Sequence, residues 1–128
     1  ANNSSGMACG ITENSYQTIT SMLVVLPSGT IVDTGRADAA DVLRAAEPAL
    51  FAGLSSLRER LLASPDKVAF LRQQFSMKNT MGYGLNALLD FDDPVRILEH
   101  LLIGSEGTLG FVAEARFRTI EVRPAIAT

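Results

Sequence analysis

The sequence predicts an α+β domain with an antiparallel sheet. β-Branched and apolar residues gather on both sides of a short glycine turn at residues 27–29, which is typical of a hairpin. Leucines with helical spacing then occupy residues 38–76, and one alternating segment comes near the C-terminal end. This order of hairpin, helices and a final strand favours α+β over an interleaved parallel fold. With 128 residues, 47% of them hydrophobic, the chain fits one small domain with a core.

The first element is the hairpin itself. Apolar runs at 21–26 and 30–33 flank Pro27, Ser28 and Gly29, and a short connection that contains glycine predicts two antiparallel strands. The preceding residues, 1–17, are polar and contain glycine, so we expect a loop there.

Helices are expected across residues 38–76. Proline interrupts a helix, so Pro48 predicts a break or a new start, and Ser64 followed by Pro65 predicts an N-cap and the first helical position. The apolar stripe of the first part consists of Leu43, Leu50, Leu54, Leu57 and Leu61, and that of the second of Val68, Leu71 and Phe75.

Residues 77–91 are predicted to be irregular, because Gly82 and Gly84 flank Tyr83. Asp93 and Pro94 then predict a helix from about 94 to 102, with Gly104 as its C-terminal cap. Its buried face should hold Ile97, Leu98, Leu101 and Leu102. The alternation after it predicts a half-buried strand, with one face made of Phe111, Ala113, Ala115, Phe117 and Thr119 and the other of Glu114, Arg116, Arg118 and Ile120.

Composition excludes several classes of function. The net charge is −3 and no block of lysine or arginine stands out, which argues against nucleic-acid binding. One cysteine gives neither a disulfide framework nor a cysteine metal cluster, and no apolar run is long enough to span a membrane. The start of the sequence has no signal-peptide pattern and opens on a polar segment, so we expect an excised piece of a larger protein.

Three stretches contain groups that suit a ligand. "IGSEGTLGF" at 103–111 has three glycines. Glycines let backbone N–H groups approach a flat or anionic ligand closely, but the same stretch is explained equally by a plain connection between a helix and a strand. It is neither a dinucleotide fingerprint nor a phosphate-binding P-loop. "NNSSGMACG" at 2–10 and "KNTMGY" at 78–83 supply amides, hydroxyls and a lysine, although a solvated terminus and a solvent-facing lysine explain them equally.

An independent catalytic centre is not predicted. His100 is the only histidine and has no second ligand at metal spacing, so a structural or surface role is expected. Cys9 has no histidine base near it in the sequence, and no triad or carboxylate pair is apparent.

Together the three stretches resemble one family. "NNSSGMACGITENSY", "KNTMGYGLNALLDF" and "LLIGSEGTLGFVAEARFRT" are similar to the second half of the FAD-binding domain of the vanillyl-alcohol-oxidase-like (PCMH-type) flavoproteins. The nearest branch is the D-2-hydroxy-acid dehydrogenases: flavin-dependent D-lactate and D-2-hydroxyglutarate dehydrogenases and the flavin subunit of glycolate oxidase. The resemblance runs from residue 2 to about 119, and residues 36–76, a helical insert, share only the helical pattern.

The resemblance implies an antiparallel sheet with helices packed on one face, forming the second subdomain of the FAD-binding domain. The glycine-rich stretches would lie along FAD, and the chain would belong to an enzyme that oxidises D-lactate, D-2-hydroxyglutarate or a glycolate-type acid. The alternative is a non-catalytic α+β module that binds a ligand or partner. The implied cofactor-binding residues are Asn3, Ser4, Ser5, Gly6, Asn79, Thr80, Gly82, Gly104, Ser105, Glu106, Gly107, Gly110 and Val112, with Phe111 at the start of the last strand.

In this family the phosphate-loop subdomain comes before such a segment and the substrate domain after it, with an iron–sulfur module in the large members. The expected partners are therefore FAD and these other parts of a parent chain, with the catalytic residues outside the 128 residues and the isolated piece inactive. We expect a cytoplasmic location, with membrane attachment only through the parent protein. An exposed half-cleft would also form an apolar patch through which two copies associate.

Overall fold

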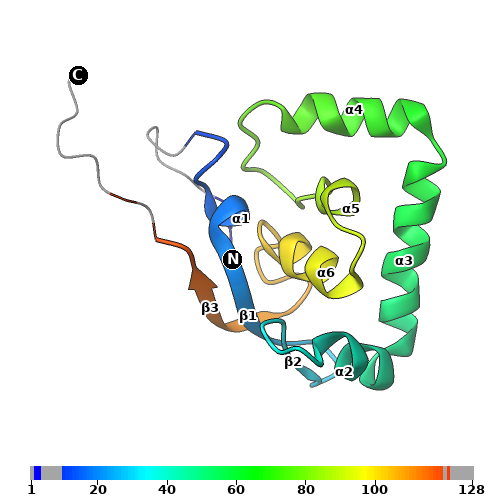
Figure 1. The fold of residues 1–128 in the computed structure, drawn as a ribbon, viewed down its shortest axis with the longest axis vertical. Coiled ribbons are helices and arrows are strands. Elements are labelled where there is room, and N and C mark those ends of the chain that lie inside the picture. The colour runs from blue at the N-terminus through cyan, green and yellow to red at the C-terminus, as the bar shows by residue number, and fades with distance from the viewer. Residues whose placement is uncertain (1, 4–9, 120, 122–128) are drawn as a thin grey trace.

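The computed structural model describes residues 2–3, 10–119 and 121, and within them it is an α+β fold (Figure 1). The strands are β1 (Ile19–Val25), β2 (Ile31–Asp33) and β3 (Phe111–Phe117). They form one antiparallel sheet in the order β2-β1-β3, so β1 is central and β3 is an edge strand. The helices are α1 (Ser15–Thr18), α2 (Ala39–Ala46), α3 (Pro48–Leu62), α4 (Pro65–Phe75), α5 (Ala87–Asp90) and α6 (Pro94–Leu102).

The predicted hairpin is confirmed. Leu23, Val24 and Val25 of β1 pair with Asp33, Val32 and Ile31 of β2. The turn between them closes through the N–H of Gly29, which donates to the carbonyl of Leu26 at 2.8 Å, and Gly29 has a positive φ of 89°. Because a side chain rarely adopts this φ, glycine is the residue that lets the chain reverse here.

The proline signals also set the helix boundaries as predicted. Pro48 and Pro65 stand at the starts of α3 and α4, and Pro94 starts α6. Asp93 caps α6, since its side chain accepts the N–H of Val95 at 3.0 Å, whereas Ser64 makes no side-chain cap bond to α4. The structure adds the short helix α5 within the segment predicted to be irregular.

Helix α6 lies at the centre of the domain, between the sheet and α3 (Figure 1). Its predicted apolar face is buried, and the burial extends to every residue of the helix except Arg96. The core cluster joins α6 to β1, β2, α2 and the inner face of α3, with Met22, Val24, Val32, Leu43, Ile97 and Leu102 all almost inaccessible. No described helix has the length and apolar character needed to cross a membrane.

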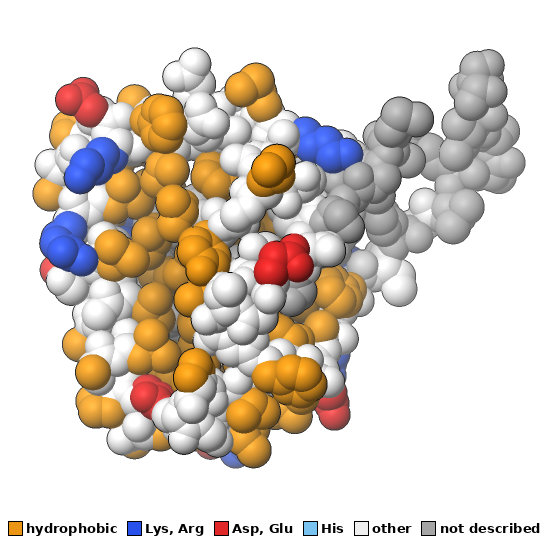
Figure 2. Space-filling view, turned by 180° about the vertical axis from the view of Figure 1, so that it is seen from behind, with side chains coloured by type: hydrophobic (Ala, Val, Ile, Leu, Met, Phe, Trp, Pro, Cys, Tyr) orange, Lys and Arg blue, Asp and Glu red, His pale blue; other side chains and the backbone are white. Residues whose placement is uncertain are grey.

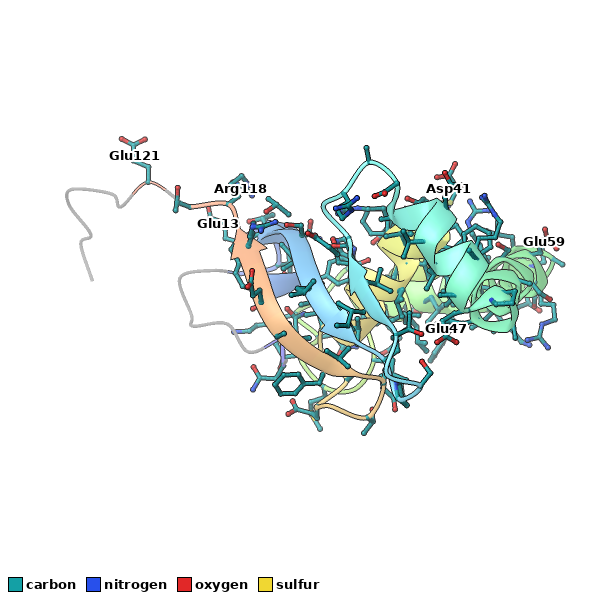
Figure 3. The ribbon with its side chains drawn as sticks, turned by 90° about the horizontal axis from the view of Figure 1, so that it is seen from below. Glu13, Asp41, Glu47, Glu59, Arg118 and Glu121 are labelled. Carbon is teal, nitrogen blue, oxygen red and sulfur yellow. The ribbon has the colours of Figure 1, made fainter. Side chains whose placement is uncertain are left out.

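Two expectations about burial are wrong. Strand β3 is exposed along nearly its whole length, with Val112 alone part-buried, although alternation predicted one buried face containing Phe111, Ala113, Ala115 and Phe117. The reason is coverage: most of the helices lie on the side of β2, the opposite edge of the sheet, and leave β3 uncovered (Figure 3). Leu57 is likewise 38% exposed, because α3 buries only a narrow stripe around Leu54.

Candidate functional site

Two of the three singled-out stretches meet backbone to backbone. Gly82 and Gly104 have φ values of 73° and 89°, and a Cβ built on Gly104 would lie 2.3 Å from the carbonyl oxygen of Gly82. A second link joins the same loops, since the hydroxyls of Tyr83 and Thr108 are hydrogen-bonded at 2.8 Å. The loops 77–86 and 103–110 are therefore held against each other, and only glycine fits at their closest approach.

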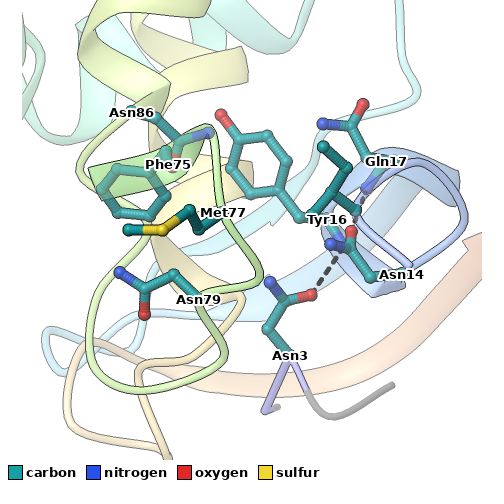
Figure 4. Close-up of a pocket in the computed structure, with 9 residues that line it drawn as sticks. Asn3, Asn14, Tyr16, Gln17, Phe75, Met77, Asn79 and Asn86 are labelled. Atoms are coloured by element: carbon teal, nitrogen blue, oxygen red, sulfur yellow. Dashed lines mark hydrogen bonds between the residues drawn. The ribbon is translucent and has the colours of Figure 1, made fainter. Parts of the chain in front are cut away.

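The third stretch reaches the same region through its described residues. Asn3 accepts the backbone N–H of Tyr16 at 3.1 Å, and it faces Asn79 across a small hollow (Figure 4). Ser4, Ser5 and Gly6 lie outside the described residues. Thr80 is part-buried in the loop that carries both Asn79 and Gly82. Loop 77–86 thus connects the hollow at one end with the glycine contact at the other.

Side-chain amides dominate this hollow. Its lining contains Asn3, Asn14, Gln17, Asn79 and Asn86, together with Tyr16 and the apolar side chains of Ile11, Phe75 and Met77 (Figure 4). The interior admits about 30 Å³, which is room for a water molecule rather than for an aromatic ring system. A large ligand would have to lie over the loops and not inside this hollow.

The turn at 104–108 contains one side chain that stabilises the end of α6 and two backbone N–H groups without a partner among the described residues. Buried Ser105 donates its hydroxyl to the carbonyl of Leu102 at 2.9 Å, which satisfies an end group of α6. Glu106 is the one non-glycine residue with a positive φ among the described residues, at 52°, and Gly107 follows at 84°. Both are exposed, and their backbone N–H groups have no hydrogen-bond partner within the part of the chain that the structure describes.

Gly110 and Val112 have roles in packing. A Cβ on Gly110 would come within 3.2 Å of the carbonyl oxygen of Val25, so glycine lets this loop pass close to β1. Val112 is part-buried against the core. Both contacts favour the structural interpretation for these two residues, whereas Glu106 and Gly107 keep groups that a ligand could use.

A polar cluster under the hollow was missed by sequence reasoning. The hydroxyl of Tyr16 and the amide of Asn86 both donate to Asp90 Oδ2, at 2.8 and 2.9 Å. Burial, together with the neighbouring Asp90 carboxylate, raises the pKa of Tyr16 far above its ordinary value, so this phenol stays protonated. The other amide atom, Asn86 Oδ1, is buried and has no hydrogen-bond partner among the described residues.

A second buried network surrounds Glu99, whose side chain is completely inaccessible. The hydroxyl of Thr34 donates to Glu99, and the Arg96 guanidinium lies 2.6 Å from Oε1, although not in hydrogen-bonding alignment. Burial raises the pKa of Glu99, while Thr34 and Arg96 act in the opposite direction. The network ties the end of the hairpin to α6, and helical spacing gave no sign that a glutamate would be buried.

His100 lies in the core of the domain. It is 3% exposed, its Nδ1 lies 2.8 Å from the carbonyl of Arg96, and its ring packs against Tyr16 and Phe91. Burial lowers the pKa of His100 to about 4, so the ring is neutral at pH 7 and donates from Nδ1. No group of three or more potential metal ligands occurs among the residues described.

An apolar hollow of about 350 Å³ lies where hydrophobic side chains gather on the back of the molecule (Figure 2). Leucines of α3, α4 and α5 line it together with Leu85 at the end of loop 77–86, and Arg60 and Lys67 complete the lining. It contains none of the residues that the resemblance implicates.

Comparison with family models, with curated proteins and with solved structures found no match to this chain.

Proposed function

We propose that the chain is part of the FAD-binding domain of a flavin-dependent dehydrogenase that oxidises a D-2-hydroxy acid. The observation that supports this most is the contact between Gly82 and Gly104. It brings "KNTMGY" and "IGSEGTLG", two of the stretches that carry the resemblance, into one surface, and Asn3 extends that surface across the hollow.

The chemistry of this surface fits one side of a flavin nucleotide. The N–H groups of Glu106 and Gly107, which have no partner among the described residues, are donors suited to pyrophosphate oxygens, and the paired hydroxyls of Tyr83 and Thr108 suit a ribityl chain. Close-packed glycine backbone permits a flat ring to approach. When bound, the flavin would accept the hydride from the α-carbon of the hydroxy acid; the residues of this chain would hold and orient it.

The size of the hollow limits the proposal. A space of about 30 Å³ cannot enclose an isoalloxazine ring, so the cofactor would lie across the outer surface of the loops and need a second wall from another part of the protein. We therefore expect the 128-residue chain to bind FAD weakly. The alternative function, a non-catalytic binding module, is supported by the local roles of Ser105 and Gly110, which explain two of the implicated residues without a ligand.

Titration with FAD, followed by flavin fluorescence, tests the proposal. We expect saturable binding weaker than micromolar in the wild type and a further loss in Gly107→Ala, which restricts the turn at φ 84°. Gly53→Ala is the matched control, because Gly53 lies in α3 with open space around it and away from the loops. Submicromolar affinity would contradict the single-wall geometry, and equal binding by both variants would favour the alternative.

A further inference from the structure

The outer edge of β3 has the features of a self-association surface. Among the described residues β1 is the only strand that pairs with β3, so one row of its backbone N–H and C=O groups has no strand beside it. Phe111 is 69% exposed and Phe117 47%, an unusual load of aromatic surface for a seven-residue strand. Figure 3 shows β3 at the outside of the sheet, with most of the helices on the side of β2.

The hydrogen bonds to β1 fix which residues face outward. The N–H of Arg118 donates to the carbonyl of Thr18 at 2.7 Å, and the carbonyl of Arg116 accepts the hydroxyl of Thr20 at 2.9 Å. Residues 116 and 118 thus direct their backbone groups toward β1. Because these groups alternate along a strand, Ala115 and Phe117 present theirs to the free edge.

A two-fold antiparallel pairing places one residue opposite its own copy, and the charges discriminate between the choices. Centred on Glu114 or on Arg116, it would place two like charges directly opposite each other, which is repulsive. Centred on Ala115, the pairing places Glu114 of each copy opposite Arg116 of the other. These two pairs make no backbone hydrogen bonds to each other, and side chains approach most closely in such pairs. Centred on Phe117, it would place Arg116 opposite the partner's Arg118, which is repulsive. Centred on Ala113, it would place Glu114 opposite the partner's Val112, and it would fall on the irregularity between the Glu114 and Val112 pairs.

We propose that this chain associates with a second copy by antiparallel pairing of β3 with β3, centred on Ala115. The charges are available for it: Glu114 and Arg116 lie 3.9 Å apart within one strand, and both side chains remain 63% exposed. Because Glu114 and Arg116 carry opposite charges on either side of Ala115, a two-fold rotation about Ala115 brings each charge opposite one of the other sign. A strand protected against pairing would instead carry like charges or proline along this edge.

Sedimentation velocity over a concentration series tests the proposal. The wild type forms a dimer, and Glu114→Arg or Arg116→Glu raises its Kd about tenfold or more, because each change makes two opposed pairs repulsive. An equimolar mixture of the two single variants restores the dimer, since one chain then carries two positive residues and the other two negative ones. Asp41→Arg reverses one charge of another exposed ion pair, on α2, and leaves association unchanged.

The register has its own test. In a Cys9→Ser background, Ala115→Cys gives a disulfide-linked dimer under mild oxidation, because residue 115 meets its own copy at the two-fold axis. Ala113→Cys does not, since residue 113 lies opposite the partner's Phe117. A monomeric wild type, a mixture of variants that stays monomeric, or faster cross-linking at residue 113 than at 115 would overturn the proposal. None of these results bears on FAD binding, so the two proposals fail separately.

Discussion

The contact between the two glycine loops makes a prediction that can be separated from the ordinary cost of replacing glycine. Gly104 and Gly107 have nearly the same backbone, with φ values of 89° and 84°. Alanine at either position is strained by about 1–2 kcal/mol, because L residues disfavour this region. The surroundings differ: a Cβ on Gly104 would lie 2.3 Å from the carbonyl oxygen of Gly82, whereas a Cβ on Gly107 meets nothing within 4 Å.

Gly104→Ala must therefore also push the two loops apart. Overpacking of this kind costs about 1–3 kcal/mol, so we expect Gly104→Ala to lower the free energy of unfolding by about 2–5 kcal/mol and Gly107→Ala by about 1–2 kcal/mol. Urea unfolding followed by circular dichroism measures both variants against the wild type. Equal losses in the two variants would show that loops 77–86 and 103–110 do not touch at Gly104. The contact on which the candidate site depends would then be absent.

Three further predictions concern the core and the helix ends. In the unfolded chain His100 takes up a proton below about pH 6.5, whereas in the folded protein it does so only near its lowered pKa of about 4, so the free energy of unfolding falls by roughly 2 kcal/mol between pH 7 and pH 5. Urea unfolding across this range should show a weaker pH dependence in His100→Gln, and a pH dependence equal to that of the wild type would contradict the buried neutral ring. Asp93→Ala removes the cap of α6 and should cost about 1 kcal/mol in thermal unfolding, whereas Ser64→Ala, with no cap bond to lose, should cost under about 0.5 kcal/mol. Thr34→Val removes the hydroxyl donor of the buried carboxylate and should cost about 1–3 kcal/mol in urea unfolding, while Thr20→Val, at an exposed site, should cost less than about 1 kcal/mol; similar losses would mean that the carboxylate does not depend on this donor.

Local signals carried most of the secondary structure. Prolines at 48, 65 and 94 fixed three helix starts, because a residue without an N–H is tolerated at the first helical turn and costs most further in. The glycine turn at 27–29 fixed the hairpin register, since a short connection leaves few ways to pair the strands. These signals act within a few residues and need no knowledge of the rest of the fold.

Burial was harder to predict, because it depends on what lies opposite an element. The alternation in 111–119 predicts a half-buried strand only if a helix or sheet covers one face, and no described element covers most of β3. Glu99 shows the reverse error. It lies outside the predicted buried face of the helix, but the packing around α6 buries every residue of the helix except Arg96, and the carboxylate is matched by Thr34 and Arg96.

In the candidate site, too, features that follow local patterns were predicted and features that depend on packing were not. Sequence reasoning predicted that Gly104 would cap α6, whereas Ile103 holds the C-cap position and Gly104 follows it with a positive φ. It also grouped the glycine stretches through their resemblance, and the structure brings 77–86 against 103–110. It could not find the polar cluster of Tyr16, Asn86 and Asp90, whose members are up to 74 residues apart and follow no motif. Such clusters arise from the packing of the chain, which no short pattern encodes.

Amide chemical shifts recorded during a titration with FAD test the central claim most directly. If FAD lies on these loops, the shifted resonances belong to loops 77–86 and 103–108, with Glu106 and Gly107 changing most and Asn3 at the border. ADP then reproduces the changes at Glu106 and Gly107 alone. Shifts confined to the residues of α3, α4 and α5 that line the apolar hollow, or none at the highest FAD concentration, would contradict a flavin-facing surface on these loops.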